Sequence, residues 1–270
     1  RHTECILPAV TFLRLSRLQC ILAVVCAAPP PLPAQHPYRW VVDSVQVLAE
    51  QGLSGLSIGP VDEAIALVDH ALNDAPTDSV LLHYRGYAWY RKGSILFSQR
   101  RTKEAKAALD SAEVALAHAG KTLTWPENSA LLGATLGQKI AVGVNPLTAM
   151  RLGRRSNAEL DRAAQRGPTN PRVFLVRGIG ALFKPKIVGG GVDKAAAELE
   201  RAITYFETDS ADAPLPSWGH SELYQWLGMT RVRQGRVPEA RAAYLRALDL
   251  NPGNVFVRDS LLSGLPPDIH

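Results

Sequence analysis

A serine between two glycines is the closest local match to a catalytic motif in this chain of 270 residues. Gly55, Ser57 and Gly59 have the spacing of the nucleophile elbow, which exposes a serine beside an oxyanion hole at a strand-to-helix turn. The preceding residues, 41–51, have the apolar period of a helix. Because the strand is missing, a serine hydrolase that uses Ser57 is the least favoured function.

A glycine run at residues 189–191 precedes an expected helix. Free backbone N–H groups at a helix N-terminus can hold an anion. However, no Lys-Ser or Lys-Thr pair follows and no strand precedes, so the fingerprint of a phosphate loop is not met. Since Gly190 has counterparts at Gly59 and Gly235, we interpret the run as a turn between helices.

Histidines and carboxylates are scattered along the sequence. None of the seven histidines has the spacing of a metal motif, and no carboxylate pair is fixed by local spacing. We therefore expect no metal site, no cofactor and no catalytic residue.

What recurs along the chain is a packing pattern. Four segments align without a gap on Ala64, Ala105, Ala195 and Ala240, and a weaker copy starts at Ser156. A large residue follows each alanine anchor four positions later, and another alanine follows seven positions later. This spacing places the three side chains on one face of an α-helix, where the alanines let a neighbouring helix approach closely.

Glycines form a second pattern upstream of three of these helices. Gly86, Gly178 and Gly228 each follow a large apolar residue by four positions. A glycine inside a helix costs about 1 kcal/mol relative to alanine, so its recurrence indicates that another helix crosses closely at these positions.

The two patterns together resemble the tetratricopeptide repeat, a helix–turn–helix unit of about 34 residues. Residues 221–252 match it most closely, and the other copies are looser, with anchors 41, 51, 39 and 45 residues apart. The resemblance gives a structural role to Gly86, Ala105, Gly178, Ala195, Ala202, Tyr224, Leu227, Gly228, Ala240, Tyr244, Ala247 and Pro252.

The resemblance implies an all-α domain over residues 35–270. Its fold would be a right-handed superhelical α-solenoid of about five helix–turn–helix repeats with a C-terminal capping helix. The helices are expected at residues 38–51 with 60–73, 79–92 with 102–118, 127–143 with 147–166, 171–183 with 192–207, and 220–234 with 238–250, followed by a cap at 254–263. Prolines fall between most of these segments, as expected for residues that end helices.

In this family the first helix of each repeat lines an inner groove. By the repeat register, the groove residues here are His83, Tyr87, Arg91, Arg172, Leu175, Ile179, Glu222, Gln225, Met229 and Arg233. The Lys/Asn set with which some members hold a peptide carboxylate is absent, so capture of a peptide C-terminus is not expected. We expect Arg172 and Arg233 to contact an acidic partner and to tolerate replacement by glutamate without loss of folding.

Charge is unevenly distributed in a chain of net charge +5. Residues 151–186 hold nine bases and two acids, whereas residues 193–222 hold seven acids and two bases. Such blocks arise from solvated helix faces, or from a basic zone that holds an acidic peptide, an anionic lipid or a sugar acid. The small net charge argues against nucleic acid as a partner.

These observations favour a non-catalytic scaffold that binds a protein or peptide, acidic if the basic zone contacts it. The alternative is a binding protein for a small anionic ligand, similar to the exported helical-repeat subunits of periplasmic TRAP transporters.

Residues 1–34 differ in composition from the rest. Arg14 and Arg17 precede an apolar stretch at 18–28 and a proline run, which is the layout of a secretory signal peptide cleaved after Ala34. The apolar stretch is too short for a durable membrane anchor, and no apolar run in the chain approaches 18 residues. We therefore expect an exported protein of the periplasm or cell envelope without a transmembrane segment.

All three cysteines lie in this N-terminal segment, so the exported chain would have no disulfide. The residues before Cys26 resemble a lipobox, but Val25 stands where that motif requires Gly, Ala or Ser. Lipid attachment to Cys26, or retention of the segment as an anchor, is the less favoured alternative.

The processing can be tested directly. We expect the mature protein to start at Gln35, because the apolar stretch has the length of a signal peptide and not of a membrane span. N-terminal sequencing of protein from the native host measures this. An intact residue 20, or lipid on Cys26, would refute it.

Overall fold

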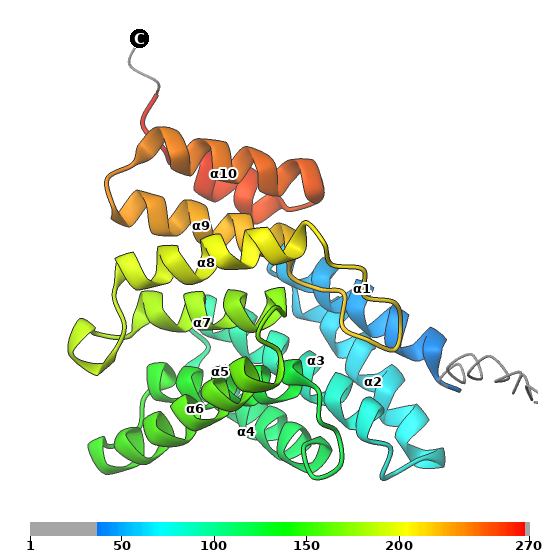
Figure 1. The fold of residues 1–270 in the computed structure, drawn as a ribbon. Helices are drawn as coiled ribbons and strands as arrows, with labels where there is room; N and C mark the ends of the chain where they lie inside the picture. Colours follow the sequence, from blue (N-terminus) through cyan, green and yellow to red (C-terminus); the bar gives the residue numbers. More distant parts are fainter. Residues whose placement is uncertain (1–36, 268–270) are drawn as a thin grey trace, which may run out of the picture. The chain divides into compact units, whose positions relative to one another are not determined.

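The computed structural model describes residues 37–267, which form ten α-helices and no β-strand (Figure 1). Consecutive helices pack in pairs, so the expected all-α solenoid is confirmed. The pairs are α1 (Arg39–Gly55) with α2 (Ile58–Asp74), α3 (Ser79–Ser98) with α4 (Thr102–Ala119), α5 (Pro126–Val142) with α6 (Pro146–Arg166), α7 (Pro171–Phe183) with α8 (Val192–Phe206), and α9 (His220–Arg233) with α10 (Val237–Leu250). Single helical turns follow α7 at Lys186–Val188 and α10 at Val257–Leu262.

The helix ends differ from the expected ones by at most six residues. None of the described helices is both long and apolar enough to cross a membrane. The expected signal peptide, its cleavage site and Cys26 lie outside the described residues.

Local sequence explains where several helices begin. Asp78 and Asn170 precede α3 and α7, and each side-chain oxygen accepts hydrogen bonds from two backbone N–H groups at 2.9–3.3 Å. Pro126, Pro146 and Pro171 each occupy the first position of a helix, where the missing N–H would have no partner in the helix.

Glycine lets the helices of a pair cross closely. A Cβ atom on Gly178 would lie 2.6 Å from Leu199 Cγ, and one on Gly228 would lie 2.3 Å from Tyr244 Cε1. Both distances are far below van der Waals contact, so any larger residue would push the helices apart. The close crossing that the glycine pattern predicted is confirmed.

The alignment of the second repeat needs a correction. Gly93, and not Gly86, is the equivalent of Gly178, because its Cβ position lies 2.8 Å from Leu109, four residues after Ala105. Gly86 also crosses closely, but against Leu116, two helical turns farther along α4. A shift of seven residues keeps a helix face almost unchanged, which is why the pattern fitted both positions.

The signature alanines are fully buried between the paired helices. Leu227 and Tyr244 are also buried, Tyr224 is half-buried, and Pro252 is exposed in the turn after α10. Val257 packs with Ala240, Tyr244 and Ala247 in a separate small core, so the C-terminal segment caps the last pair as expected.

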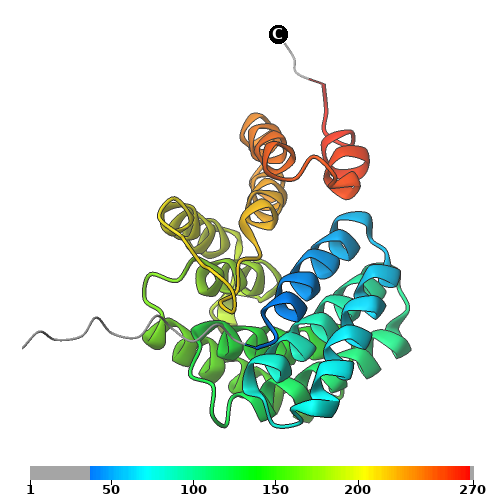
Figure 2. The same cartoon turned by 90° about the vertical axis from the view of Figure 1, so that its right-hand side faces the viewer.

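A second set of contacts joins segments that are far apart in the sequence. Residues 207–219, which we call the connector, link α8 to α9 and lie beside α1 (Figure 1, Figure 2). Gln46 of α1 accepts hydrogen bonds from the N–H and hydroxyl of Ser217 at 2.6 and 3.0 Å. Asn251, after α10, donates to Ser54 Oγ at 2.9 Å. The first helix therefore contacts the segments that precede and follow the last helix pair.

The packing of the last pair gives a stability prediction. Ala247→Leu should lower the free energy of unfolding by about 1–3 kcal/mol through overpacking, because the Ala247 side chain is fully buried. Chemical denaturation measures it. Ala242→Leu is the matched control, since Ala242 is exposed on the same helix and should change stability little. An equal effect of the two substitutions would show that the repeat register is wrong.

Candidate functional site: the inner face of the helix pairs

Most of the expected groove is closed. Seven of the ten residues are buried: His83, Tyr87, Arg91, Arg172, Leu175, Glu222 and Gln225. Ile179 and Met229 are half-buried, and Arg233 is exposed. The inner face of α3, α7 and α9 is thus covered over most of its length by α1, the connector and neighbouring helical segments.

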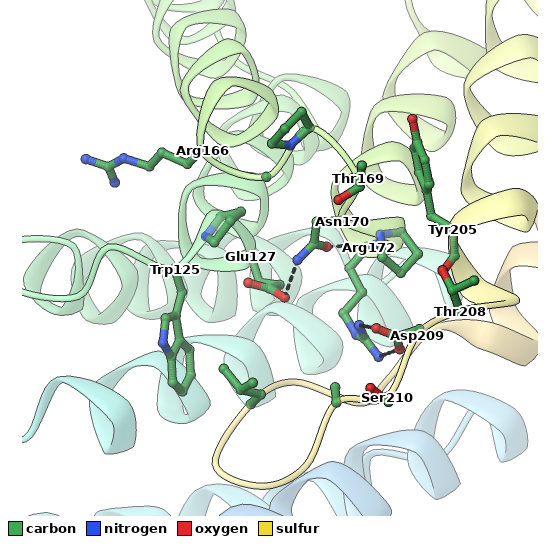
Figure 3. A pocket seen from close by; sticks show the side chains of 16 residues that line it. Trp125, Glu127, Arg166, Thr169, Asn170, Arg172, Tyr205, Thr208, Asp209 and Ser210 are labelled. Atoms are coloured by element: carbon green, nitrogen blue, oxygen red, sulfur yellow. Dashed lines mark hydrogen bonds and ion pairs between the residues drawn. The ribbon is translucent and has the colours of Figure 1, made fainter. Parts of the chain in front are cut away.

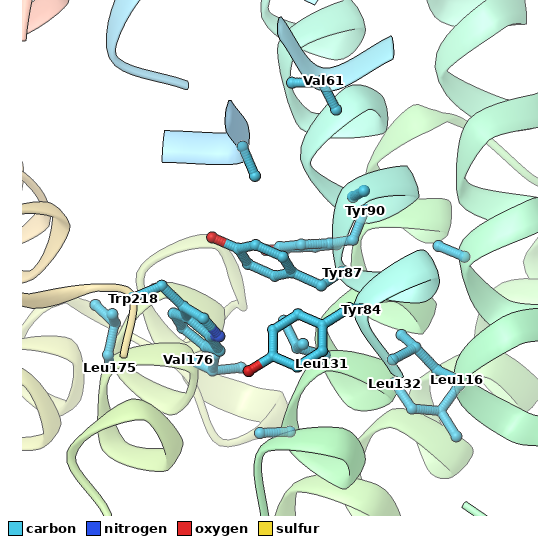
Figure 4. Packing of buried hydrophobic residues seen from close by; sticks show 14 of the residues in the cluster. Val61, Tyr84, Tyr87, Tyr90, Leu116, Leu131, Leu132, Leu175, Val176 and Trp218 are labelled. Carbon is cyan, nitrogen blue, oxygen red and sulfur yellow. The ribbon is translucent and has the colours of Figure 1, made fainter. Parts of the chain in front are cut away.

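The connector binds this inner face through three kinds of contact. Asp209 accepts two hydrogen bonds from the Arg172 guanidinium, at 2.7 and 3.1 Å. The Tyr84 hydroxyl donates to the carbonyl oxygen of Pro214 at 2.8 Å. The Trp218 ring stacks on Tyr87, with centroids 5.5 Å apart (Figure 4). These are the charge-assisted, backbone and aromatic contacts by which proteins hold extended peptides.

A buried ion pair lies beside the stacked rings. Arg91 donates to both oxygens of Glu222 at 2.9 and 2.6 Å, and the two side chains are only 2% and 5% exposed. The Arg91 guanidinium also lies 5.0–5.7 Å from the ring centroids of Tyr87, Tyr90 and Trp218. These contacts join α3 to α9 across 131 residues of sequence.

Burial in this interior also shifts the pKa of two more titratable groups, Glu50 and His83. Burial raises the pKa of Glu50, although nearby Arg91 acts in the opposite direction. Burial lowers the pKa of His83 to about 4, and Asn128 hydrogen-bonds its ring at 3.1 Å. His83 is therefore neutral near pH 7 and does not supply a positive charge to a partner.

An open pocket of about 500 Å³ borders the start of the connector (Figure 3). Arg172 and Asp209 both line it, and Glu127 accepts a hydrogen bond from Asn170 at 2.6 Å. Arg166 also lines the pocket but points away from the Arg172–Asp209 pair (Figure 3). Two arginines and two carboxylates thus line the pocket, so the lining has no excess of positive charge.

Part of the basic zone at 151–186 is neutralised by acids from other segments. Arg155 pairs with Glu113 at 2.8 Å and Arg177 with Glu198 at 2.9 Å. Arg172 is nearly inaccessible and holds Asp209, so Arg172→Glu would place two carboxylates together in a buried site. We therefore correct the expectation that Arg172 can be replaced without loss of folding.

The accessible part of the inner face lies at the C-terminal ends of α7 and α9. We call it the open end and define it by Ile179, Phe183, Met229 and Arg233. Phe183 is 58% exposed, and the Arg233 guanidinium lies 5.0 Å from its ring centroid. Arg233 also donates to the Leu182 carbonyl at 2.8 Å. This surface offers apolar and aromatic side chains next to one cation.

The other candidate chemistry has no support in the described residues. Ser57 lies between helices α1 and α2, so the strand of a nucleophile elbow is absent. The glycine run at 189–191 forms the turn before α8, and its three backbone N–H groups donate to carbonyls of the same turn or of α7. Within residues 37–267, no group of three metal-ligating side chains comes together.

Sequence reasoning missed the residues that close the inner face: Gln46, Glu50, Asp209 and Trp218. Their partners come from distant parts of the chain, which no local spacing reveals. One signal was present, because the connector is long for a turn between repeats and carries acids, prolines and a tryptophan.

The geometry defines an α-solenoid of helix pairs. Two family models described as tetratricopeptide repeat match the chain, at residues 86–112 and 221–254. Gly93 and Gly228 each stand eighth in these matches, which agrees with the corrected register. The chain therefore contains tetratricopeptide repeats at these two segments.

Solved structures show the same fold. A tetratricopeptide-repeat protein from Thermus thermophilus, TTC0263, is 18% identical with a TM-score of 0.54, over 81% of this chain and 97% of that chain. The HusA haemophore from Porphyromonas gingivalis is 20% identical with a TM-score of 0.54, over 70% and 94% of the two chains. No curated protein sequence matches this chain significantly.

The buried ion pair gives a prediction. Arg91→Met should lower the free energy of unfolding by about 3–5 kcal/mol, because Glu222 is left buried without its cation. The double variant with Glu222→Leu should recover part of this loss, since no unpaired charge remains. Urea denaturation measures all variants.

The exposed pair Arg236–Glu239 provides the control, with side chains 48% and 46% exposed. Arg236→Met should change stability by less than about 1 kcal/mol. Equal losses for Arg91→Met and Arg236→Met would contradict the role assigned to the buried pair.

Proposed function

We propose that this protein is a non-catalytic scaffold that binds a protein or peptide partner at its inner face. The observation that carries the proposal is that the inner face already holds a non-helical segment of its own chain, the connector. Tyr84 binds a backbone carbonyl of the connector, Gln46 binds a backbone N–H, and Arg172 binds a carboxylate. A surface with this set of groups is suited to an extended peptide.

The open end is where a partner makes its first contact. Phe183 and Met229 offer apolar surface, and Arg233 adds a cation beside the Phe183 ring. Aromatic residues and arginine are the side chains that contribute most to binding at protein interfaces. An acidic partner would gain a charge-assisted contact with Arg233.

We also propose that the protein acts after export, in the periplasm or cell envelope. The signal-peptide layout of residues 1–34 supports this, as does the absence of cysteine after residue 26. The N-terminal sequencing described above is its test.

A binding protein for a small anionic ligand is the second candidate. The pocket lined by Arg166 and Arg172 is the observation in its favour. It ranks second because Asp209 and Glu127 balance the two arginine charges.

Site-specific photo-crosslinking tests the scaffold proposal. A photoreactive residue at Met229 should capture a small set of defined proteins in native cells, identified by mass spectrometry. The same residue at Leu245, which is 49% exposed on α10, is the matched control and should not capture that set.

A captured partner is then purified and its affinity measured by calorimetry. Phe183→Asp with Arg233→Glu should weaken binding at least tenfold with only a small change in melting temperature, because both side chains are exposed. Identical captures at Met229 and Leu245, or unchanged affinity, would contradict the proposal.

A further inference from the structure

We propose that the connector acts as a built-in ligand of the inner face, and that the external partner displaces its first half with an extended, carboxylate-bearing segment. This inference rests on the proposed function and names the chemistry of the partner. The segment that leaves is residues 207–212, and the site that it exposes is Arg172 with the adjoining pocket.

The two halves of the connector are held very differently. Pro216 and Trp218 are buried, and Trp218 belongs to the main core. By contrast, residues 207–210 are exposed, and among the described residues their side chains make hydrogen bonds or ion pairs with the inner face only through Asp209 and Arg172. The first half can therefore separate while Trp218 keeps the second half in place.

There is room for another chain at this position. The open pocket of about 500 Å³ is lined by residues 208–211 of the connector on one side. The first turns of α5 and α7 form the opposite side (Figure 3). A peptide can thus approach Arg172 without rearrangement of the helix pairs.

The buried arginine determines what the partner must bring. Arg172 is 1% exposed, so its guanidinium would be a buried charge without a partner once Asp209 leaves. Leaving a buried charge unpaired is strongly unfavourable, and a carboxylate from the partner removes that cost. The buried Nε–H of Arg172 has no acceptor among the described residues, so one further hydrogen bond is open to the incoming group.

The covalent tether makes the connector a strong competitor. A segment joined to its site by a few residues has an effective concentration in the millimolar range, about that of short flexible linkers. A free acidic peptide should therefore bind the intact protein weakly. A partner that also contacts the open end gains the additional affinity needed to displace the tethered segment.

The test uses a fluorescein-labelled synthetic peptide with the sequence of residues 207–219 and the full-length protein. Asp209→Asn weakens the internal contact, so the protein variant should bind the peptide at least tenfold more tightly than wild type by fluorescence anisotropy. Asp212→Asn is the matched control, because Asp212 is an exposed acid of the same connector whose side chain makes no hydrogen bond or ion pair among the described residues. It should bind like wild type.

A second peptide, with Asn in place of its Asp209, shows whether binding depends on the carboxylate. It should bind the Asp209→Asn protein at least tenfold more weakly than the first peptide does. If circular dichroism shows that Asp209→Asn does not fold, wild-type protein with a protease site inserted between Ala211 and Asp212 replaces it. Cleavage at this site should raise its affinity for the first peptide at least tenfold. The inference is overturned if wild type, Asp212→Asn and Asp209→Asn (or the cleaved protein in its place) bind the first peptide with equal affinity. It is also overturned if the two peptides bind the Asp209→Asn protein with equal affinity.

The two proposals can fail separately. A partner crosslinked at Met229 that leaves hydrogen exchange of residues 208–212 unchanged would refute displacement and leave the scaffold function standing. Faster exchange of these residues on partner binding supports both.

Discussion

The close approach of paired helices at glycine is the constraint on which the rest of the structure depends. Because Gly178 and Gly228 have no Cβ, Leu199 and Tyr244 pack directly against the backbone of the neighbouring helix. This fixes how each pair is rotated, and therefore which side chains face inward. Arg91 and Glu222 meet across the inner face only because both first helices are held in that orientation.

The fold could be predicted from the sequence because its pattern is local. Each helix pair repeats the same small and large residues at helical spacing, so the ten helices follow from short segments read one at a time. The shift between Gly86 and Gly93 shows the limit of that reasoning. Two glycines two turns apart lie on nearly the same helix face, and only the contact with Leu109 distinguishes them.

The site could be predicted only in part, because its contacts depend on distant segments. The repeat register identified inner-face residues such as Tyr87 and Arg172, but not what covers them. Gln46 and Ser217 are 171 residues apart, and no periodic pattern links them. The charge blocks gave a partial signal, since the acidic block after residue 192 supplies Asp209 and Glu198 to the arginines of the basic zone.

The contacts of α1 with the connector and with Asn251 also change how this chain should fold. In an open array each repeat contacts only its neighbours, so folding can start in any repeat and spread along the chain. Here the contacts of α1 with the connector and with Asn251 form only when the end of the chain is in place. Contacts of such long sequence separation slow folding and couple the repeats, so the array should unfold as one cooperative unit and not repeat by repeat.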